Sequence, residues 1–213
     1  MKIGTILLGD VKTNCYIISN EETKEGIIID PGDNAGLIIK KLEEDNIKPV
    51  GILLTHGHFD HIMAGPKLSE HYDIPMYGYI EEGELVKDFI LNAAYLIGSK
   101  FTMKLSHFFN DGDELLLAGY KLKVIHTPGH TKGSVCFYIE DENVLISGDT
   151  LFYNSVGRTD LPTGDGMMLL RSIEKILMAL PEETKVYPGH GALTSIGYEK
   201  KNNPFIHPET IWD

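Results

Sequence analysis

The chain has 213 residues, of which 42% are hydrophobic and 23% charged, and its formal net charge is −12. We expect residues 1–213 to form one domain, because the apolar content is too high for a disordered chain and no apolar run reaches the ~18 residues of a membrane-spanning helix. The acidic balance argues against a nucleic-acid partner, and the N-terminus lacks a signal-peptide pattern, so we expect a cytoplasmic globular protein with neither membrane nor nucleic-acid partners.

The first part of the chain is expected to alternate strands with one amphipathic helix. Apolar and β-branched residues gather in short runs that predict strands at 2–8, 13–19, 26–30 and 50–54. Between the last two runs, a turn signal at Asp30–Asp33 is followed by a helical stripe of apolar residues from Leu37 to Ile47.

Residues 81–104 form a longer connection than the neighbouring strands require. Within it, the stretch from Glu84 to Ile97 has a helical pattern. A long insertion of this kind is often a lid or the wall of a site, and a surface helix over a sheet edge explains the pattern equally well.

The second half of the chain repeats the same alternation. The predicted strands lie at 114–118, 120–126, 133–139, 143–148 and 184–187. A helix is expected at 166–180, before the last of them. Strands and helices that alternate in both halves predict a layered α/β fold.

The strongest chemical signal is the segment Thr55–His61, which directly follows a buried strand. In an extended chain, alternation points His56, His58 and Asp60 to one side, while His61 faces a second point as a helix begins. Burying three imidazoles and a carboxylate without partners is costly, and a bound cation removes that cost. Neutral imidazole with carboxylate suits zinc, iron or manganese, whereas a solvated polar loop is the alternative.

Three later segments supply further ligand candidates, each at the end of a predicted strand. His130 lies in a loop that contains Gly and Pro, Asp149 follows an apolar run, and His190 follows the last strand in Tyr187–Gly191. Functional residues are usually placed on such loops, because a rigid scaffold holds them in position.

At these residues the chain resembles the metallo-β-lactamase superfamily, and the resemblance extends from Asn14–Tyr16 and Asp30–Gly32 through all the ligand loops. It implies an α/β fold, a four-layer αββα sandwich of two mixed β-sheets, with the site at one edge. It also implies a first metal held by His56, His58 and His130, a second metal held by Asp60, His61 and His190, and Asp149 as the bridge between them.

Four further motifs carry a narrower resemblance: Leu151–Phe152, Gly157–Asp160, Thr194–Lys200 and Asn203–Phe205. At these motifs the chain is similar to the short form of the glyoxalase II-like (hydroxyacylglutathione hydrolase-like) hydrolases. Antibiotic-hydrolysing members usually carry a thiolate in place of Asp149 and another residue in place of His61, so the resemblance disfavours β-lactam hydrolysis. Longer glyoxalase II-like members add a C-terminal helical domain that helps to bind glutathione. Too few residues follow His190 for that domain, so the glutathione part of the substrate stays open.

We therefore predict two divalent metal ions, zinc first and iron or manganese as alternatives, and a small-molecule thioester or ester as the substrate. Two metals about 3.5–4 Å apart can hold one hydroxide between them, and this hydroxide would attack the substrate carbonyl. Asp60 would orient the hydroxide as the catalytic residue, and Asp149 would set the separation of the metals.

Four further residues are candidates for supporting or substrate-binding roles, each with a plainer explanation. Asp30 closes a buried apolar run and could support a ligating histidine or act only as a turn carboxylate. Thr131 could brace a ligand loop or cap local backbone. Arg158 suits a substrate carboxylate, or it pairs with Asp160 instead. Tyr153 is either a wall of the substrate pocket or an exposed loop aromatic.

Three other functions stay open at this point. Persulfide dioxygenases, a related branch, hold a single iron with residues equivalent to His56, His130 and Asp149. A lactonase would use the same hydroxide on a cyclic ester, and a non-enzymatic metal or redox partner protein would bind metal without turnover. The physiological substrate and the oligomeric state are not readable from the sequence.

Overall fold

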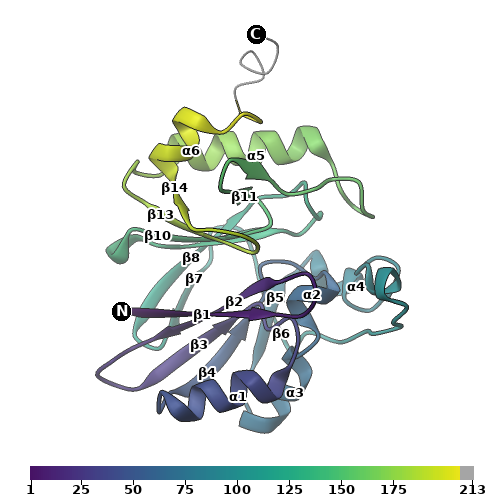
Figure 1. Cartoon of the computed structure of the whole chain (residues 1–213), viewed down its shortest axis with the longest axis vertical. Helices are drawn as coiled ribbons and strands as arrows, with labels where there is room; N and C mark the ends of the chain where they lie inside the picture. The colour runs from purple at the N-terminus through teal and green to yellow at the C-terminus, as the bar shows by residue number, and fades with distance from the viewer. Residues whose placement is uncertain (207–213) are drawn as a thin grey trace.

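The computed structural model describes residues 1–206, apart from the side chains at positions 177 and 178. Two β-sheets lie face to face, and helices cover the outer face of each sheet, which gives four layers (Figure 1). The αββα sandwich that the sequence predicts is confirmed.

The first sheet contains six strands that follow one another in chain order. The first three pair antiparallel and the last four pair parallel, so the sheet is mixed. Its strands are β1 (Lys2–Leu8), β2 (Thr13–Ser19), β3 (Glu25–Ile29), β4 (Lys48–Leu53), β5 (Met76–Tyr79) and β6 (His107–Phe109).

The second sheet is also mixed and has the strand order β14-β13-β10-β9-β8-β7. Its β10 and β13 pair parallel, and its other pairs are antiparallel. Its strands are β7 (Glu114–Leu117), β8 (Tyr120–His126), β9 (Val135–Ile139), β10 (Val144–Gly148), β13 (Lys185–Pro188) and β14 (Thr194–Ser195). A separate two-stranded ribbon consists of β11 (Leu151–Phe152) and β12 (Ser155–Val156).

The two longest helices begin at residues whose side chains accept from free backbone N–H groups. Asn34 accepts from the N–H of Leu37, and Asp165 accepts from the N–H of Met168. The helices are α1 (Ala35–Glu44), α2 (Phe59–Ile62), α3 (Gly65–Tyr72), α4 (Glu82–Leu85), α5 (Gly166–Ala179) and α6 (Ile196–Asn202), with 3₁₀ turns η1 (Ala94–Ile97) and η2 (Glu140–Glu142). Across residues 1–206, none of the helices combines the length and the apolar character needed to cross a membrane.

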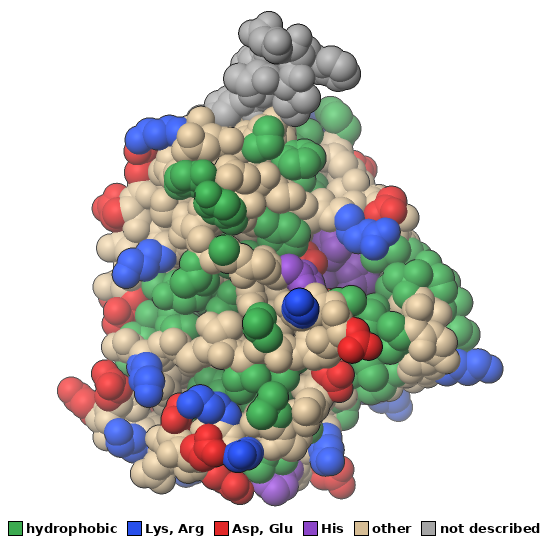
Figure 2. All heavy atoms as spheres, viewed as in Figure 1, with side chains coloured by type: hydrophobic (Ala, Val, Ile, Leu, Met, Phe, Trp, Pro, Cys, Tyr) green, Lys and Arg blue, Asp and Glu red, His purple; other side chains and the backbone are tan. Residues whose placement is uncertain are grey.

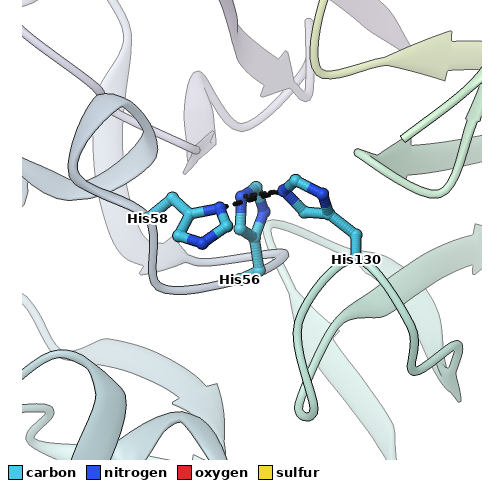
Figure 3. Close-up of side chains that lie close together, drawn as sticks. All are labelled: His56, His58 and His130. Atoms are coloured by element: carbon cyan, nitrogen blue, oxygen red, sulfur yellow. Dashed lines mark hydrogen bonds between the residues drawn. The ribbon is translucent and has the colours of Figure 1, made fainter. Parts of the chain in front are cut away.

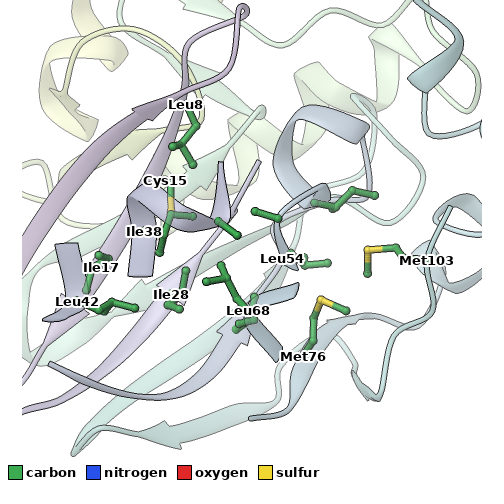
Figure 4. Close-up of a cluster of buried hydrophobic side chains, with 14 of the residues drawn as sticks. Leu8, Cys15, Ile17, Ile28, Ile38, Leu42, Leu54, Leu68, Met76 and Met103 are labelled. Carbon is green, nitrogen blue, oxygen red and sulfur yellow. The ribbon is translucent and has the colours of Figure 1, made fainter. Parts of the chain in front are cut away.

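The buried strand β3 shows how the layers pack. Ile27 and Ile29 belong to the cluster between the two sheets, whereas Ile28 belongs to the cluster between the first sheet and its helices. Figure 4 shows this outer cluster, in which Ile38 and Leu42 of α1 pack against the sheet. Each such buried side chain stabilises the fold by about 1.5–3 kcal/mol, and burial of both faces explains why the strand ends in three consecutive isoleucines.

The prediction of a continuous helix from Glu84 to Ile97 is wrong. The structure has the short helix α4 and the 3₁₀ turn η1, with turns between them. The carboxylate of Asp88 accepts from the backbone N–H of Ile90, and the buried Asn92 side chain bonds to backbone groups at the start of η1 and beyond its end, so these bonds replace helical ones. The next residue, Ala93, has a φ of 62°, which a continuing right-handed helix does not allow.

Candidate metal centre

Loops from both sheets meet at one edge of the sandwich. β4 leads into His56 and His58, β8 ends shortly before His130, and Asp149 and His190 follow β10 and β13. Because β10 and β13 are parallel neighbours, their carboxyl ends lie side by side. The predicted ligands fall into groups whose ligand atoms lie within 4.8 Å of one another: His56, His58 and His130; His56, His61 and Asp149; and Asp60, His61 and His190.

We call His56, His58 and His130 the first half-site. The Nε2 atom of His130 lies 2.9 Å from Nδ1 of His58 and 3.2 Å from Nε2 of His56, and the three rings converge in Figure 3. The residues are 1–3% exposed. Three ring nitrogens therefore face one point from which water is largely excluded.

We call Asp60, His61 and His190 the second half-site. Nε2 of His190 lies 3.3 Å from Nε2 of His61 and 3.2 Å from Oδ2 of Asp60. Asp149 lies between the two half-sites: its Oδ1 is 3.5 Å from Nε2 of His61, and its Oδ2 is 3.5 Å from Nε2 of His130. One carboxylate thus offers an oxygen to each half-site.

Hydrogen bonds at the far side of the rings determine which ring nitrogens point inward as acceptors. The Nδ1–H of His130 donates to the carbonyl of Arg158 at 2.7 Å, and that of His190 donates to the carbonyl of Val11 at 3.2 Å. With the proton on Nδ1, the Nε2 atom of each neutral ring carries a lone pair toward the centre. This is the arrangement that metal-ligating histidines usually have.

The buried carboxylate of Asp30 is connected to both half-sites by hydrogen bonds. Its Oδ2 accepts from Nδ1 of His61 at 3.0 Å and from the hydroxyl of Thr55 at 2.6 Å, and its Oδ1 accepts from the N–H of Thr55 at 2.8 Å. The Thr55 hydroxyl in turn lies 3.2 Å from Nδ1 of His56. Asp30 is 1% exposed and has a φ of 52°, a conformation that Asp tolerates better than most residues.

The electrostatic environment of the first half-site favours neutral imidazoles. Burial, followed by the neighbouring imidazoles, holds the pKa of His56 and of His58 well below the ordinary value. Burial also lowers the pKa of His130. Unprotonated imidazole is the form that binds a metal.

In the second half-site, opposite charges dominate. Burial alone would lower the pKa of His61, but Asp60, Asp149 and Asp30 outweigh it and raise this pKa to about 10. Burial likewise opposes ionisation of Asp60, but His61 and His190 hold the pKa of this carboxyl below its usual range. The carboxylates that favour a protonated His61 would equally favour a metal cation at this point.

The residues fit a pair of divalent cations. Among the described residues, the buried Oδ1 of Asp149 has no hydrogen-bond partner, although it faces His61. A tetrahedral site with metal–nitrogen distances of about 2.0–2.1 Å separates its ligand atoms by about 3.3 Å, close to the spacings found here. Imidazole with carboxylate suits zinc, iron and manganese alike.

A cavity of about 640 Å³ opens onto both half-sites. Its wall includes Ala93, Leu96 and Ile97 from the segment 81–104, so part of this segment borders the site. The other apolar residues of the lining are Val11, Phe59, Phe152, Val156 and Leu161. A mostly apolar cavity beside converging polar groups is typical of a small-molecule site.

The two predicted substrate-binding residues have different positions. Arg158 lines the cavity, and its guanidinium forms a bidentate pair with Asp160 at 2.7 and 2.8 Å. Tyr153 stacks on Tyr198 with ring centroids 5.1 Å apart, and it lies outside the cavity lining drawn from residues 1–206. Contact of either side chain with a substrate stays a prediction.

Two buried residues that the sequence pattern does not single out hold the ligand loops. Thr13, at the start of β2, donates from its hydroxyl to Oδ2 of Asp60 at 2.9 Å. Glu82 accepts from backbone N–H groups of Gly57 and Gly133, and also from the hydroxyl of Thr131. Glu82 stands in an acidic run that is typical of a solvated surface, so the sequence gives no local signal of its burial.

The family model described as the metallo-beta-lactamase superfamily matches residues 8–190. The chain therefore belongs to this superfamily. It is similar to a probable metallo-hydrolase, YqgX of Bacillus subtilis, with 38% identity over 209 residues that cover 97% of this chain and 98% of that protein. It is also similar to the hydroxyacylglutathione hydrolase GloC of Haemophilus influenzae, with 34% identity over 213 residues that cover 99% of this chain and 100% of that protein.

The fold is also similar to those of several solved structures. The fold is similar to that of BLEG-1 B3 metallo-beta-lactamase, with a TM-score of 0.92, 40% identity, and coverage of 96% of this chain and 99% of that one. TTHA1623 in a di-iron-bound form has a TM-score of 0.85 and 36% identity, covering 95% and 99% of the two chains. ETHE1 from Myxococcus xanthus has a TM-score of 0.78 and 27% identity, covering 100% and 92%.

Proposed function

We propose that this protein is a binuclear metal-dependent hydrolase that cleaves a thioester or ester, with a hydroxyacylglutathione-like thioester as the first candidate substrate. The main support is the convergence of two complete half-sites on the shared carboxylate of Asp149. The similarity to the hydroxyacylglutathione hydrolase GloC supports the substrate class.

Two divalent cations in these half-sites would supply an activated water and a Lewis acid for the substrate carbonyl. Asp60 is the residue proposed to orient the attacking water, since its carboxylate lines the cavity and is held by Thr13 and His190. Its depressed pKa keeps the carboxylate ionised, so that it can accept a hydrogen bond from water at neutral pH.

The cavity wall is proposed to hold the acyl group. Phe59, Leu96 and Leu161 offer apolar surface beside the ligands and exclude bulk water from the carbonyl. Arg158 is proposed to meet a substrate carboxylate at the cavity edge by exchanging or sharing its bond to Asp160. A thiolate is a good leaving group, so thioester cleavage needs less help from a general acid than amide cleavage does.

A mononuclear-iron persulfide dioxygenase is the second candidate, because the chain shares its fold with ETHE1. That function would use His56, His130 and Asp149 and would leave the second half-site without a role. The close approach of Asp60, His61 and His190 therefore favours the hydrolase. A lactonase would use the same centre, and a non-enzymatic metal or redox partner would have no use for the apolar cavity.

Metal analysis combined with substrate assays tests the proposal. We expect two metals per chain and cleavage of S-lactoylglutathione that is lost on chelation and restored by zinc. A simple lactone, glutathione persulfide with oxygen uptake, and a β-lactam are the comparison substrates, the last because of the similarity to BLEG-1. One iron per chain with oxygen consumption, or unchanged thioesterase activity after full demetallation, would refute the hydrolase.

A further inference from the structure

Glu82 is a buried carboxylate beside the metal centre that no proposed chemical step uses. It is the first residue of α4 and is 2% exposed. A carboxylate in the interior is costly unless hydrogen-bond donors surround it, so its partners indicate what it stabilises.

Three donors from two ligand loops surround this carboxylate. The backbone N–H of Gly57 donates to Oε2 at 2.6 Å. The backbone N–H of Gly133 and the hydroxyl of Thr131 donate to Oε1 at 2.8 and 2.9 Å. Gly57 separates the first two ligands of the first half-site, and Thr131 directly follows the third.

The two loops belong to different sheets, so Glu82 links the sheets next to the first half-site. Gly57 follows β4 of the first sheet, while Thr131 and Gly133 lie between β8 and β9 of the second. A backbone bond from Val135 to Thr55 also joins these loops, at the strand ends. Glu82 bonds to the parts of the loops that carry the imidazoles.

Glycine at both backbone contacts is what allows this close approach. A Cβ atom at Gly57 would lie 2.8 Å from Oε2 of Glu82, and one at Gly133 would lie 2.6 Å from Oε1. Any side chain at either position would push the carboxylate away from the backbone. The bonds of Glu82 therefore depend on a matched set of residues in both loops.

We propose that Glu82 is a positioning residue that fixes the distance between the His56–His58 pair and His130, and thereby sets the metal affinity of the first half-site. Glu82 also lies near the start of the segment 81–104, whose Leu96 and Ile97 line the cavity, so it links this cavity wall to the ligand loops. The proposal rests on the proposed function only in requiring that the first half-site binds a metal ion.

The variant Glu82→Gln tests this role, because it keeps the side-chain volume but replaces one acceptor oxygen with an NH₂ group that can only donate. Glu199→Gln is the matched control. Glu199 is also fully buried, and it accepts from the side chain of Asn203 at 2.7 Å and the N–H of Asn154 at 3.0 Å, on residues outside the ligand loops. Zinc stoichiometry and affinity are measured by competition with a chromophoric chelator, alongside thermal unfolding of the metal-free proteins.

We expect Glu82→Gln to weaken zinc binding at one of the two sites by about 10–100-fold, the usual effect of losing a residue that orients metal ligands. Glu199→Gln should leave both zinc affinities within about twofold of the wild type, although both variants lower the unfolding temperature of the metal-free protein. Unchanged zinc affinity in Glu82→Gln, or an equal loss in Glu199→Gln, would overturn the proposal.

If Glu82→Gln does not fold, the variant Thr131→Val tests whether the hydrogen bonds of Glu82 set the zinc affinity. It removes one of the three donors, so a smaller loss of zinc affinity at the same site is expected, and wild-type affinity would contradict the proposal. Zinc titration also separates this proposal from the hydrolase: a wild-type protein that binds two zinc ions and cleaves no thioester would refute the hydrolase alone.

Discussion

The two half-sites share one sheet edge but are held together by different forces. In the first, burial keeps three converging imidazoles neutral, and the carboxylate of Asp149 lies 3.5 Å from one of them, His130. In the second, Asp60 attracts His61 and His190, whose pKa values are both raised. The second is also more open, since the side chain of His190 is 27% exposed and that of His130 only 2%.

The supports of the two half-sites differ in the same way. Glu82 links the loops of the first half-site, whereas hydrogen bonds from strand β2 hold the His190 loop of the second half-site. Asn14 donates to carbonyl groups on both sides of this loop, and the hydroxyl of Tyr16 donates to one of them at 2.6 Å. Without metal, attraction between Asp60 and the two histidines holds the second half-site together. The first half-site depends instead on the hydrogen bonds of Glu82 to its loops.

Replacement of Asp60 should give the largest effect. Asp60→Asn is expected to lower kcat for thioester cleavage by about 10²–10⁴-fold, because the neutral amide is a weaker metal ligand in the second half-site and orients the attacking water poorly. The fold should survive, since the amide oxygen can still accept from Thr13. Steady-state kinetics, metal content and thermal unfolding are measured on the same samples.

The outcome also tests whether the half-sites are separable. Metal in the first half-site should be retained in Asp60→Asn, because none of its three imidazoles contacts this carboxylate. Loss of both metals would contradict the separation, and a kcat within about threefold of the wild type would remove Asp60 from the mechanism.

The candidate ligands can be picked out from the sequence because each one is a local feature. His56, His58, Asp60 and His61 stand within one short segment after a buried strand, and strand ends carry the other three. The strands at 13–19 and 120–126 coincide with β2 and β8, since alternating or continuous apolar residues reflect burial directly.

Glu82 and the segment 84–97 show what such patterns miss. Glu82 follows one acidic residue and precedes another by two positions, and only the fold brings Gly57 and Gly133 to it. The helical pattern of residues 84–97 is interrupted where the Asp88 carboxylate accepts from a nearby backbone N–H and the Asn92 amide donates to a nearby carbonyl. Long-range contacts therefore outweigh the local pattern at Glu82, whereas short-range bonds between side chains and backbone outweigh it in the segment 84–97.

In the metal-free protein, the histidine pKa values of the two half-sites are expected to be shifted in opposite directions from the ordinary value. His61 should stay protonated well above neutral pH, because its pKa is raised to about 10, whereas His56 should stay neutral in mild acid. NMR of the metal-free protein with ¹⁵N-labelled histidine follows each ring. A His61 ring that titrates near pH 6.5, the pKa of histidine in an unfolded chain, would contradict this difference between the half-sites.

Stability should follow these titrations. The raised pKa of His61 stabilises the fold fully below about pH 6.5, and this contribution is lost as the pH rises toward 10, by at most about 1.4 kcal/mol per pH unit. For His56 and His58 the sign is reversed, so their contribution is lost as the pH falls below about 6.5. Denaturant unfolding of the metal-free wild type and of His61→Gln measures the contribution of His61. The difference between their free energies of unfolding should shrink as the pH rises.

The smallest expected effect separates the two roles of Arg158. Its backbone carbonyl supports the first half-site through His130, while its exposed guanidinium pairs with Asp160. Arg158→Gln should therefore leave zinc affinity within about twofold and raise KM for S-lactoylglutathione by about two- to fivefold, the size of an exposed ion pair. A neutral N-acetylcysteamine thioester should be affected less, because it offers no carboxylate.

Asp160→Asn is the matched control for this prediction. It frees the guanidinium without moving the backbone carbonyl, so KM for the anionic thioester should fall while zinc affinity stays constant. Equal changes for the anionic and the neutral thioester in Arg158→Gln would mean that the side chain shapes the cavity rather than recognising charge. A drop in zinc affinity would instead mean that the Arg158–Asp160 pair holds the carbonyl in place, and that the first half-site depends on the cavity rim as well as on Glu82.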